Sequence, residues 1–194
     1  MKFATVDDGY EPDRCAENTR KFLAEDAFAV FGYIGTPTSL AALPLATRDN
    51  APFFAPFTGA MALREPFNRY AFHLRASYND ETAQIVKQMS SVGLKKFGVL
   101  FQNDAYGKAG LDGMTLALKD VGQKLVAQAS FERNTVDVAK AVATLVEVKP
   151  DVIVQVGAYK ACAEFIRQAR KAGYGGTFYN VSFVGTQALS DELG

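Results

Sequence analysis

Residues 31–59 read FGYIGTPTSLAALPLATRDNAPFFAPFTG and contain, twice in succession, an apolar run that ends in small hydroxyl or glycine residues. The first run, Ala27–Gly32, leads through Gly35-Thr36-Pro37-Thr38-Ser39 into a helical pattern, and the second, Phe53–Phe57, leads into Thr58-Gly59-Ala60. A strand that feeds a helix places the free backbone N–H groups of the first helical turn at the sheet edge, where anions bind. Two such ends side by side predict a cradle for a small carboxylate.

The alternation of strand-like and helical patterns continues outward along the whole chain. The predicted strands are Lys2–Val6, Ala27–Gly32, Phe53–Phe57, Tyr70–Arg75, Lys96–Gln102, Leu125–Phe131, Val152–Gly157 and Thr177–Asn180. The predicted helices are Pro12–Leu23, Thr38–Thr47, Asp80–Ser91, Ala105–Val121, Val136–Val148, Lys160–Ala172 and one that begins at Gln187. Runs such as FGVLF and VIVQV are apolar on both faces, which is typical of parallel strands covered by helices. The pattern predicts a doubly wound α/β fold.

The domain organisation has two interpretations. Residues 61–68 (MALREPFN) interrupt the alternation, and Ala76–Asp80 forms a polar connection before the next helix. One interpretation makes this connection a crossover between a first lobe, 1–75, and a second lobe, 76–194. The other is a single sheet with a long loop, and the pattern alone does not choose between them.

Composition narrows the function classes. The 194 residues carry 21 basic and 21 acidic side chains without a basic tract, which argues against nucleic acid or an anionic membrane as partner. His73, the single histidine, is expected to be structural, and Cys15 and Cys162 are expected to be unpaired. We expect no metal site, no cofactor and no catalytic group, since neither a glycine-rich nucleotide loop nor a cluster of metal-ligating residues follows a strand.

Several segments together resemble a known family. They are DDGYEP (7–12), FGYIGTPTSLAALPL (31–45), PFFAPFTGAMALREPFNRYAFHLRASYNDET (52–82), FGVLFQNDAYGKAGLDG (97–113), ERNTVDVAKAVATL (132–145) and KPDVIVQVGAYKACAEFIRQARKAGYGGTFYNVSFVG (149–185). In this order they resemble the type I periplasmic solute-binding proteins of the leucine/isoleucine/valine-binding family, the receptors of amino-acid ABC importers. The resemblance implies two lobes that close on a ligand, a transporter permease as partner and a periplasmic location.

The resemblance also implies that the chain is partial. Family members have a further strand and helix ahead of Lys2 and continue well past Gly194, so we expect a fragment or a truncated product that lacks some ligand contacts. No leader with a charged start and an apolar core opens the chain, so we expect any export signal to be absent from it. Because of unpaired strand edges and uncovered apolar faces, we expect the chain either to self-associate or to depend on a partner segment for solubility.

In the first lobe, the resemblance implies that Thr36 binds the ligand carboxylate, with Thr38 and Ser39 close behind. The backbone carbonyl of Phe57 would accept the ligand ammonium, and Thr58 stands one position earlier than the family's threonine. The alternative is that Thr36 or Thr38 only caps its helix, as such residues do routinely.

In the second lobe, the resemblance implies that Tyr106 and Tyr159 close over the ligand. Tyr106 has the alternative of packing on the hinge. Ser182 stands where the leucine binder offers a glutamate to the ligand ammonium, and a buried ammonium without a counter-ion is costly. Either another carboxylate substitutes, for example one from the part of the family's chain that is absent here, or the ligand is not an α-amino acid of the usual kind.

Three functions remain open. The first is a receptor that delivers an amino acid or a related small carboxylate to an ABC importer. The second is the same fold used as the ligand-sensing domain of a regulator or receptor. The third is a Rossmann-like enzyme, which would need a base or nucleophile at a strand end, where the sequence has threonine, phenylalanine, tyrosine and asparagine.

Overall fold

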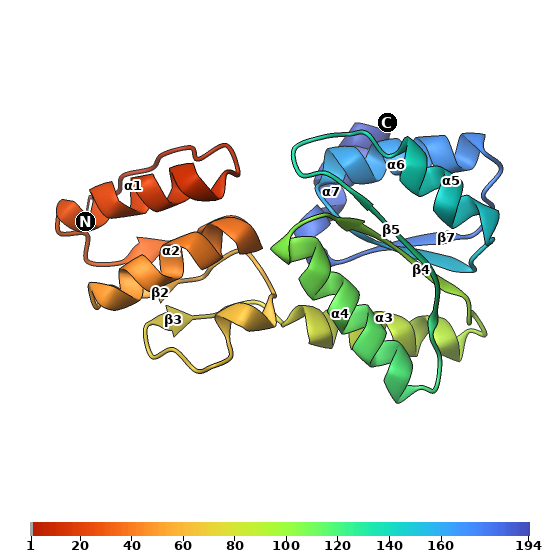
Figure 1. The fold of residues 1–194 in the computed structure, drawn as a ribbon, viewed down its shortest axis with the longest axis horizontal. Helices are drawn as coiled ribbons and strands as arrows, with labels where there is room; N and C mark the ends of the chain where they lie inside the picture. Colours follow the sequence, from red (N-terminus) through yellow and green to blue (C-terminus); the bar gives the residue numbers. More distant parts are fainter. Residues whose placement is uncertain (1) are drawn as a thin grey trace. The chain divides into compact units, whose positions relative to one another are not determined.

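The computed structural model describes residues 2–194 and contains two compact units, Met1–Ala76 (unit 1) and Ser77–Gly194 (unit 2) (Figure 1). Each unit is a parallel sheet with helices packed on it. The predicted α/β fold with parallel strands is therefore confirmed.

Unit 1 contains a small three-stranded sheet in the order β1-β2-β3. Its elements are α1 (Pro12–Ala24), β1 (Val30–Phe31), α2 (Thr36–Arg48), β2 (Phe53–Phe54), the 3-10 helix η1 (Met61–Leu63) and β3 (Ala71–Phe72). All pairs are parallel, with Val30 opposite Phe53 and Phe53 opposite Ala71. Helices α1 and α2 pack together on one face of the sheet and bury Cys15, Ala42 and Ala46 against its residues.

The strands that the sequence predicts for unit 1 are more numerous and longer than those in the structure. The predicted strand Lys2–Val6 is wrong, because these exposed residues have no strand partner among residues 2–194 and a strand needs a neighbouring ladder. The predicted strands Ala27–Gly32, Phe53–Phe57 and Tyr70–Arg75 each shrink to two residues. Ala55 has φ 53°, which ends β2 early, and the ladder resumes as a single bridge between Ile34 and Phe57.

Unit 2 contains a four-stranded sheet in the order β5-β4-β6-β7, and every pair is parallel. Its strands are β4 (Phe97–Gln102), β5 (Leu125–Phe131), β6 (Val152–Val156) and β7 (Thr177–Asn180). Its helices are α3 (Tyr78–Ser91), α4 (Ala105–Asp120), α5 (Ala139–Glu147), α6 (Tyr159–Lys171) and α7 (Thr186–Leu193), with the 3-10 helix η2 (Ser182–Val184) before α7.

Helices cover both faces of this second sheet (Figure 1). Leu100 and Ile153 point toward α5 and α6 and form a core with Phe165. Val156 lies on the opposite face, against Gly110 of α4, and α3 packs on α4. Strand β6 is consequently buried along its whole length, as the apolar run VIVQV predicted.

The chain is anchored on both sides of the boundary between the units. The Arg64 guanidinium donates to the carbonyls of Arg75 (2.7 Å) and Ala76 (3.3 Å), which ties the end of unit 1 to η1. Ser77 is the N-cap of α3 and forms a capping box with Asp80. The predicted crossover Ala76–Asp80 is therefore too long, and α3 begins at Tyr78 instead of Asp80.

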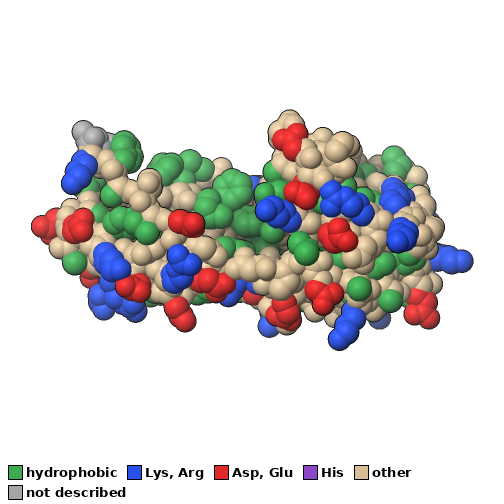
Figure 2. Space-filling view, turned by 90° about the horizontal axis from the view of Figure 1, so that it is seen from above, with side chains coloured by type: hydrophobic (Ala, Val, Ile, Leu, Met, Phe, Trp, Pro, Cys, Tyr) green, Lys and Arg blue, Asp and Glu red, His purple; other side chains and the backbone are tan. Residues whose placement is uncertain are grey.

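The sheet of unit 1 has one apolar face that no helix of residues 2–76 covers. Side chains alternate along a strand, so Val30 and Phe53 face α1 and α2 while Phe31, Phe54 and Phe72 face the other way. Their rings follow one another across the three strands, with centroids 5.8 and 6.2 Å apart, and they are 66%, 38% and 46% exposed. Figure 2 shows hydrophobic side chains grouped on the surface of this unit, away from most of its charged ones.

None of the helices within residues 2–194 combines the length and the apolarity that a membrane span requires.

We define the phenylalanine face of unit 1 as Phe31, Phe54 and Phe72. We expect it to drive self-association, since association removes an exposed aromatic patch from water. Burial of a phenylalanine contributes about 1.5–3 kcal/mol, so Phe54→Thr should weaken association about tenfold or more. Sedimentation velocity across a concentration series measures this. Phe67→Thr is the control, because Phe67 is 86% exposed but lies outside the sheet. A protein that stays monomeric at all concentrations would contradict the expectation.

Candidate ligand-binding site

One candidate site, within unit 1, is the beginning of α2. Its N-cap is Gly35, at φ 92°, and no side chain caps the helix. A Cβ at position 35 would lie 2.2 Å from the Tyr10 ring, so glycine is required by both the backbone angle and the space. Because α2 lacks a side-chain cap, its first turn keeps the partial positive charge that attracts anions.

Thr36 and Thr58 are brought together at this helix start. Their hydroxyl oxygens lie 2.6 Å apart, and the Thr58 oxygen also accepts the Ala60 N–H at 3.2 Å. Both side chains are about 1% exposed. The two loops that follow β1 and β2 thus meet through a buried pair of hydroxyls, as the repeated pattern of the sequence suggested. The role of either hydroxyl in ligand binding stays a prediction.

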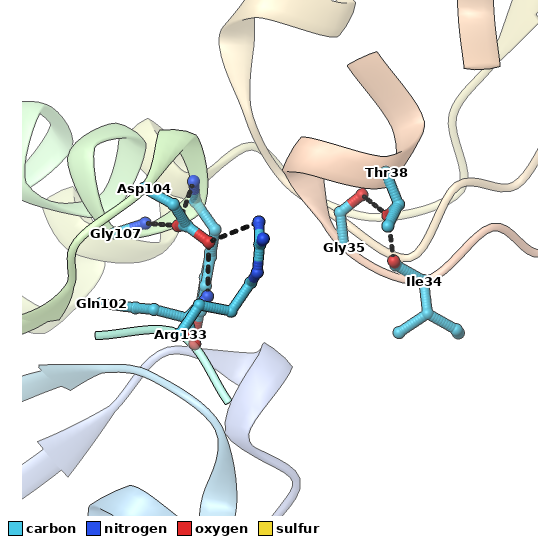
Figure 3. A network of polar contacts seen from close by, with 8 residues as sticks. Ile34, Gly35, Thr38, Gln102, Asp104, Gly107 and Arg133 are labelled. Atoms are coloured by element: carbon cyan, nitrogen blue, oxygen red, sulfur yellow. Dashed lines mark hydrogen bonds and ion pairs between the residues drawn. The ribbon is translucent and has the colours of Figure 1, made fainter. Parts of the chain in front are cut away.

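Thr38 and Ser39 follow in the same helical turn but differ in their contacts. The Thr38 hydroxyl donates to the carbonyl oxygens of Ile34 and Gly35, so it stabilises the turn that precedes the helix (Figure 3). The Ser39 hydroxyl is buried and has no hydrogen-bond partner among residues 2–194. Of these two, Ser39 therefore has the hydroxyl with unused hydrogen-bonding capacity.

Phe57 contributes both a carbonyl and a ring. Its carbonyl oxygen accepts the Gly35 N–H at 3.2 Å, so the group predicted to receive a ligand ammonium already has a backbone donor. The Arg75 guanidinium carbon lies 3.8 Å from the centre of the Phe57 ring, a cation–π contact. Phe57 is thus fixed between α2 and the end of unit 1.

A separate candidate site, within unit 2, is the edge of its sheet where the strands end. Asp104 caps α4: one oxygen accepts the N–H groups of Tyr106 (2.9 Å) and Gly107 (3.2 Å). The other oxygen accepts the Gln102 amide at 2.6 Å and lies 3.9 Å from the Arg133 guanidinium (Figure 3). The sequence patterns did not identify Arg133, which follows β5 and lies far from Asp104 along the chain.

Tyr106 lies inside an aromatic cluster of unit 2. Its ring is 4.5 Å from that of Phe183 and 5.5 Å from that of Tyr78, and its hydroxyl donates to the Gly157 carbonyl at 3.3 Å. Tyr106 is fully buried. This arrangement resembles the packing alternative, and a role in closing over a ligand stays a prediction.

Tyr159 and Ser182 have different surroundings. Tyr159 opens α6, which also lacks a side-chain cap, and its half-buried ring lies 6.0 Å from the Lys160 ammonium. The N–H and hydroxyl of Ser182 donate to the two oxygens of Glu81 at 2.8 and 2.7 Å. Glu81 thus places a carboxylate next to Ser182, the position where the resemblance had led us to expect a glutamate. Glu81 belongs to α3 and lies 101 positions from Ser182 in the sequence.

The two cysteine thiols of this chain are protonated at pH 7. Burial, reinforced by the neighbouring Asp8, raises the pKa of the Cys15 thiol to about 12, and burial raises that of Cys162 to about 12. Both cysteines are free, which confirms that prediction. Burial lowers the pKa of His73, and Arg64 lowers it further, so this ring is neutral at pH 7. Within residues 2–194, no group of three or more His, Cys, Asp and Glu side chains could hold a metal ion.

Comparison with known proteins assigns the class. A family model described as periplasmic binding protein matches residues 1–194. A structure described as a possible leucine/isoleucine/valine-binding protein from Rhodopirellula baltica superimposes with a TM-score of 0.95 at 37% identity, over 100% of this chain and 54% of its own. This chain therefore belongs to the type I periplasmic binding proteins of the leucine/isoleucine/valine-binding family.

Two further comparisons concern less similar proteins. The Leu/Ile/Val-binding protein homolog 7 of Brucella abortus is 24% identical over 81% of this chain and 42% of its own length. A solute-binding protein of an ABC transporter from R. palustris, solved in complex with benzoate, has a TM-score of 0.87 at 20% identity, over 100% of this chain and 55% of its own. The chain thus spans about half the length of the relatives it matches.

We expect Thr36→Val to weaken carboxylate binding by about 1.5–3 kcal/mol, since it keeps the shape and removes a hydroxyl that donates to a charged group. Titration calorimetry measures the affinity. Thr47→Val is the matched control: Thr47 lies near the other end of α2, where its hydroxyl donates to the Leu43 carbonyl. Equal affinity in Thr36→Val and Thr47→Val would leave Thr36 as a structural residue only.

Proposed function

We propose that this protein is the ligand-binding part of a receptor for an ABC importer, and that it holds a small carboxylate at the uncapped start of α2. The observation that carries the proposal is the meeting of the β1 and β2 loops, where Thr36 and Thr58 share a buried hydroxyl contact beneath a helix N-terminus. Hydroxyl and amide donors in this arrangement suit a carboxylate, because charge-assisted hydrogen bonds are shorter and stronger than neutral ones.

Family membership supports the receptor role. Its proteins are solute-binding receptors, generally without catalysis, and the family implies a periplasmic or extracellular location. The protonated thiols of this chain agree with binding, since neither of them is a ready nucleophile. The transporter permease is the partner that this role requires.

The relatives support a carboxylate as the ligand class. The R. palustris protein was solved with benzoate, and the Brucella and Rhodopirellula proteins are named for leucine, isoleucine and valine. All four molecules carry one carboxylate on an apolar body. Phe57, 37% exposed beside the α2 start, offers an apolar surface for such a body.

A thermal-shift panel tests the proposal. We expect at least one carboxylate among amino acids, 2-oxo acids and aryl acids to raise the melting temperature. A ligand at a hundredfold excess over its dissociation constant adds about 2.7 kcal/mol to the free energy of unfolding. Nucleotides and sugars are the controls, and stabilisation by these alone would contradict the proposal.

A further inference from the structure

The loop between β1 and α2 is held by α1 and by the segment that precedes α1. Both ends of this loop are glycines with a left-handed backbone, Gly32 at φ 68° and Gly35 at φ 92°. Glycine loses more conformational freedom on folding than any other residue, so such a loop needs contacts from other elements to keep one conformation. Its conformation matters for the proposed carboxylate site, because the loop leads directly into the first turn of α2.

Two of these contacts come from α1 itself. The Tyr33 hydroxyl lies 2.8 Å from the Thr19 hydroxyl, and it is the donor of this pair because Thr19 donates to the Cys15 carbonyl. The Cys15 thiol donates to the Thr38 carbonyl at 3.5 Å. Helix α1 thus contacts both the middle of the loop and the first turn of α2.

The third contact is made by Tyr10, which lies before α1. A Cβ at position 35 would collide with two carbon atoms of the Tyr10 ring and would lie 3.0 Å from its hydroxyl oxygen. The ring therefore fills the space where a side chain of residue 35 would stand. Hydrogen bonds hold the two backbone groups of Gly35: its N–H donates to the Phe57 carbonyl, and its carbonyl accepts the Ser39 N–H and the Thr38 hydroxyl (Figure 3).

Tyr10 reaches this position through an unfavourable backbone conformation. Gly9 and Tyr10 have φ 62° and 61° at the centre of a turn that the Glu11 N–H and the Asp8 carbonyl close at 3.1 Å. The Asp8 carboxylate also accepts the Tyr10 N–H at 2.8 Å. Positive φ at both central residues is the feature of a type I′ turn, where glycine, asparagine and aspartate dominate. A tyrosine at the second of these positions is strained, and such residues persist where surrounding structure holds them.

The strain singles out the tyrosine side chain. A glycine at position 10 would form the same turn more easily but would leave Gly35 uncovered. The turn that the ring covers leads to the Thr36 hydroxyl, which is paired with that of Thr58. It also leads to the Ser39 hydroxyl, which is fully buried and has no hydrogen-bond partner among residues 2–194. These are the side chains that the proposed site offers to a carboxylate.

We propose that Tyr10 is a positioning residue of the carboxylate site, because its ring holds the Gly35 turn and with it the first N–H groups and hydroxyls of α2. This inference rests on the proposed function, adds a residue from outside the two loops of the site, and involves unit 1 alone. The apparent affinity of a ligand falls with the fraction of molecules in the binding conformation. If about one molecule in ten keeps this conformation without the ring, binding weakens about tenfold.

Titration calorimetry on the whole chain tests the inference, with leucine, 4-methyl-2-oxopentanoate and benzoate as probes. Tyr10→Gly removes the ring and suits the positive φ of residue 10, so the turn before α1 is kept. We expect this variant to weaken binding about tenfold for the probe that the wild-type protein binds most tightly. Tyr10→Phe keeps the ring and should restore the wild-type affinity.

Tyr70→Gly is the matched control. Tyr70 is also a half-buried tyrosine of unit 1, and its hydroxyl donates to Asn50, just beyond the other end of α2. Both glycine variants lose a half-buried ring and should lower the melting temperature, but only Tyr10→Gly should lower the affinity. Equal affinities of the two variants would overturn the inference and leave the receptor role intact. A loss in Tyr10→Phe as large as in Tyr10→Gly would also overturn it, because the hydroxyl would then be the group that serves the carboxylate.

Hydrogen exchange followed by NMR gives a readout without a ligand. In Tyr10→Gly the amides of Thr36, Thr38 and Ser39 should exchange faster than in the wild type, whereas Tyr70→Gly should leave their rates unchanged. Wild-type rates in Tyr10→Gly would overturn the inference. If neither these probes nor any other carboxylate of the thermal-shift panel binds the wild-type protein, the proposed function fails, and the inference fails with it.

Discussion

Parallel strand pairing is the constraint on which the rest of this structure depends. Each strand of the two sheets runs in the same direction as its neighbours, so all strand ends and helix starts of a unit gather at one edge. The first turn of every helix brings unsatisfied N–H groups to that edge. What can bind at the edge of each unit therefore depends on which groups accept hydrogen bonds from these N–H donors.

The helix starts fall into two groups, those with a side-chain cap and those without one. Helices α3 and α4 receive side-chain caps from Ser77 and Asp104, so their first N–H groups are satisfied within unit 2. The other helices, α1, α2, α5, α6 and α7, begin without a side-chain cap. A helix start that the chain leaves uncapped can serve an external anion, and two of these five starts, those of α2 and α6, lie where the sequence predicted ligand contacts, at Thr36 and Tyr159.

The two sheets also differ in how their faces are used. Helices lie on both faces of the β5-β4-β6-β7 sheet, which explains why β6 is apolar throughout. The β1-β2-β3 sheet is covered by α1 and α2 on one face, and its other face displays a row of phenylalanine rings. Parallel sheets are normally buried on both faces, so we expect another layer of protein structure to pack on the phenylalanine face.

The sequence by itself determined the fold class and the order of the helices, since apolar periodicity is a local signal, and from the GTPTS segment it predicted an anion-binding position at the α2 start. Strand extent was decided by tertiary structure: KFATV has strand character, yet Lys2–Val6 pairs with no strand of residues 2–194. The sequence patterns did not predict the long-range contacts either. Ser182 donates a hydrogen bond to Glu81 across 101 positions, and Arg133, which follows another strand, forms an ion pair with Asp104. Local patterns fix which backbone groups need partners, and only the folded chain decides which distant side chains supply them.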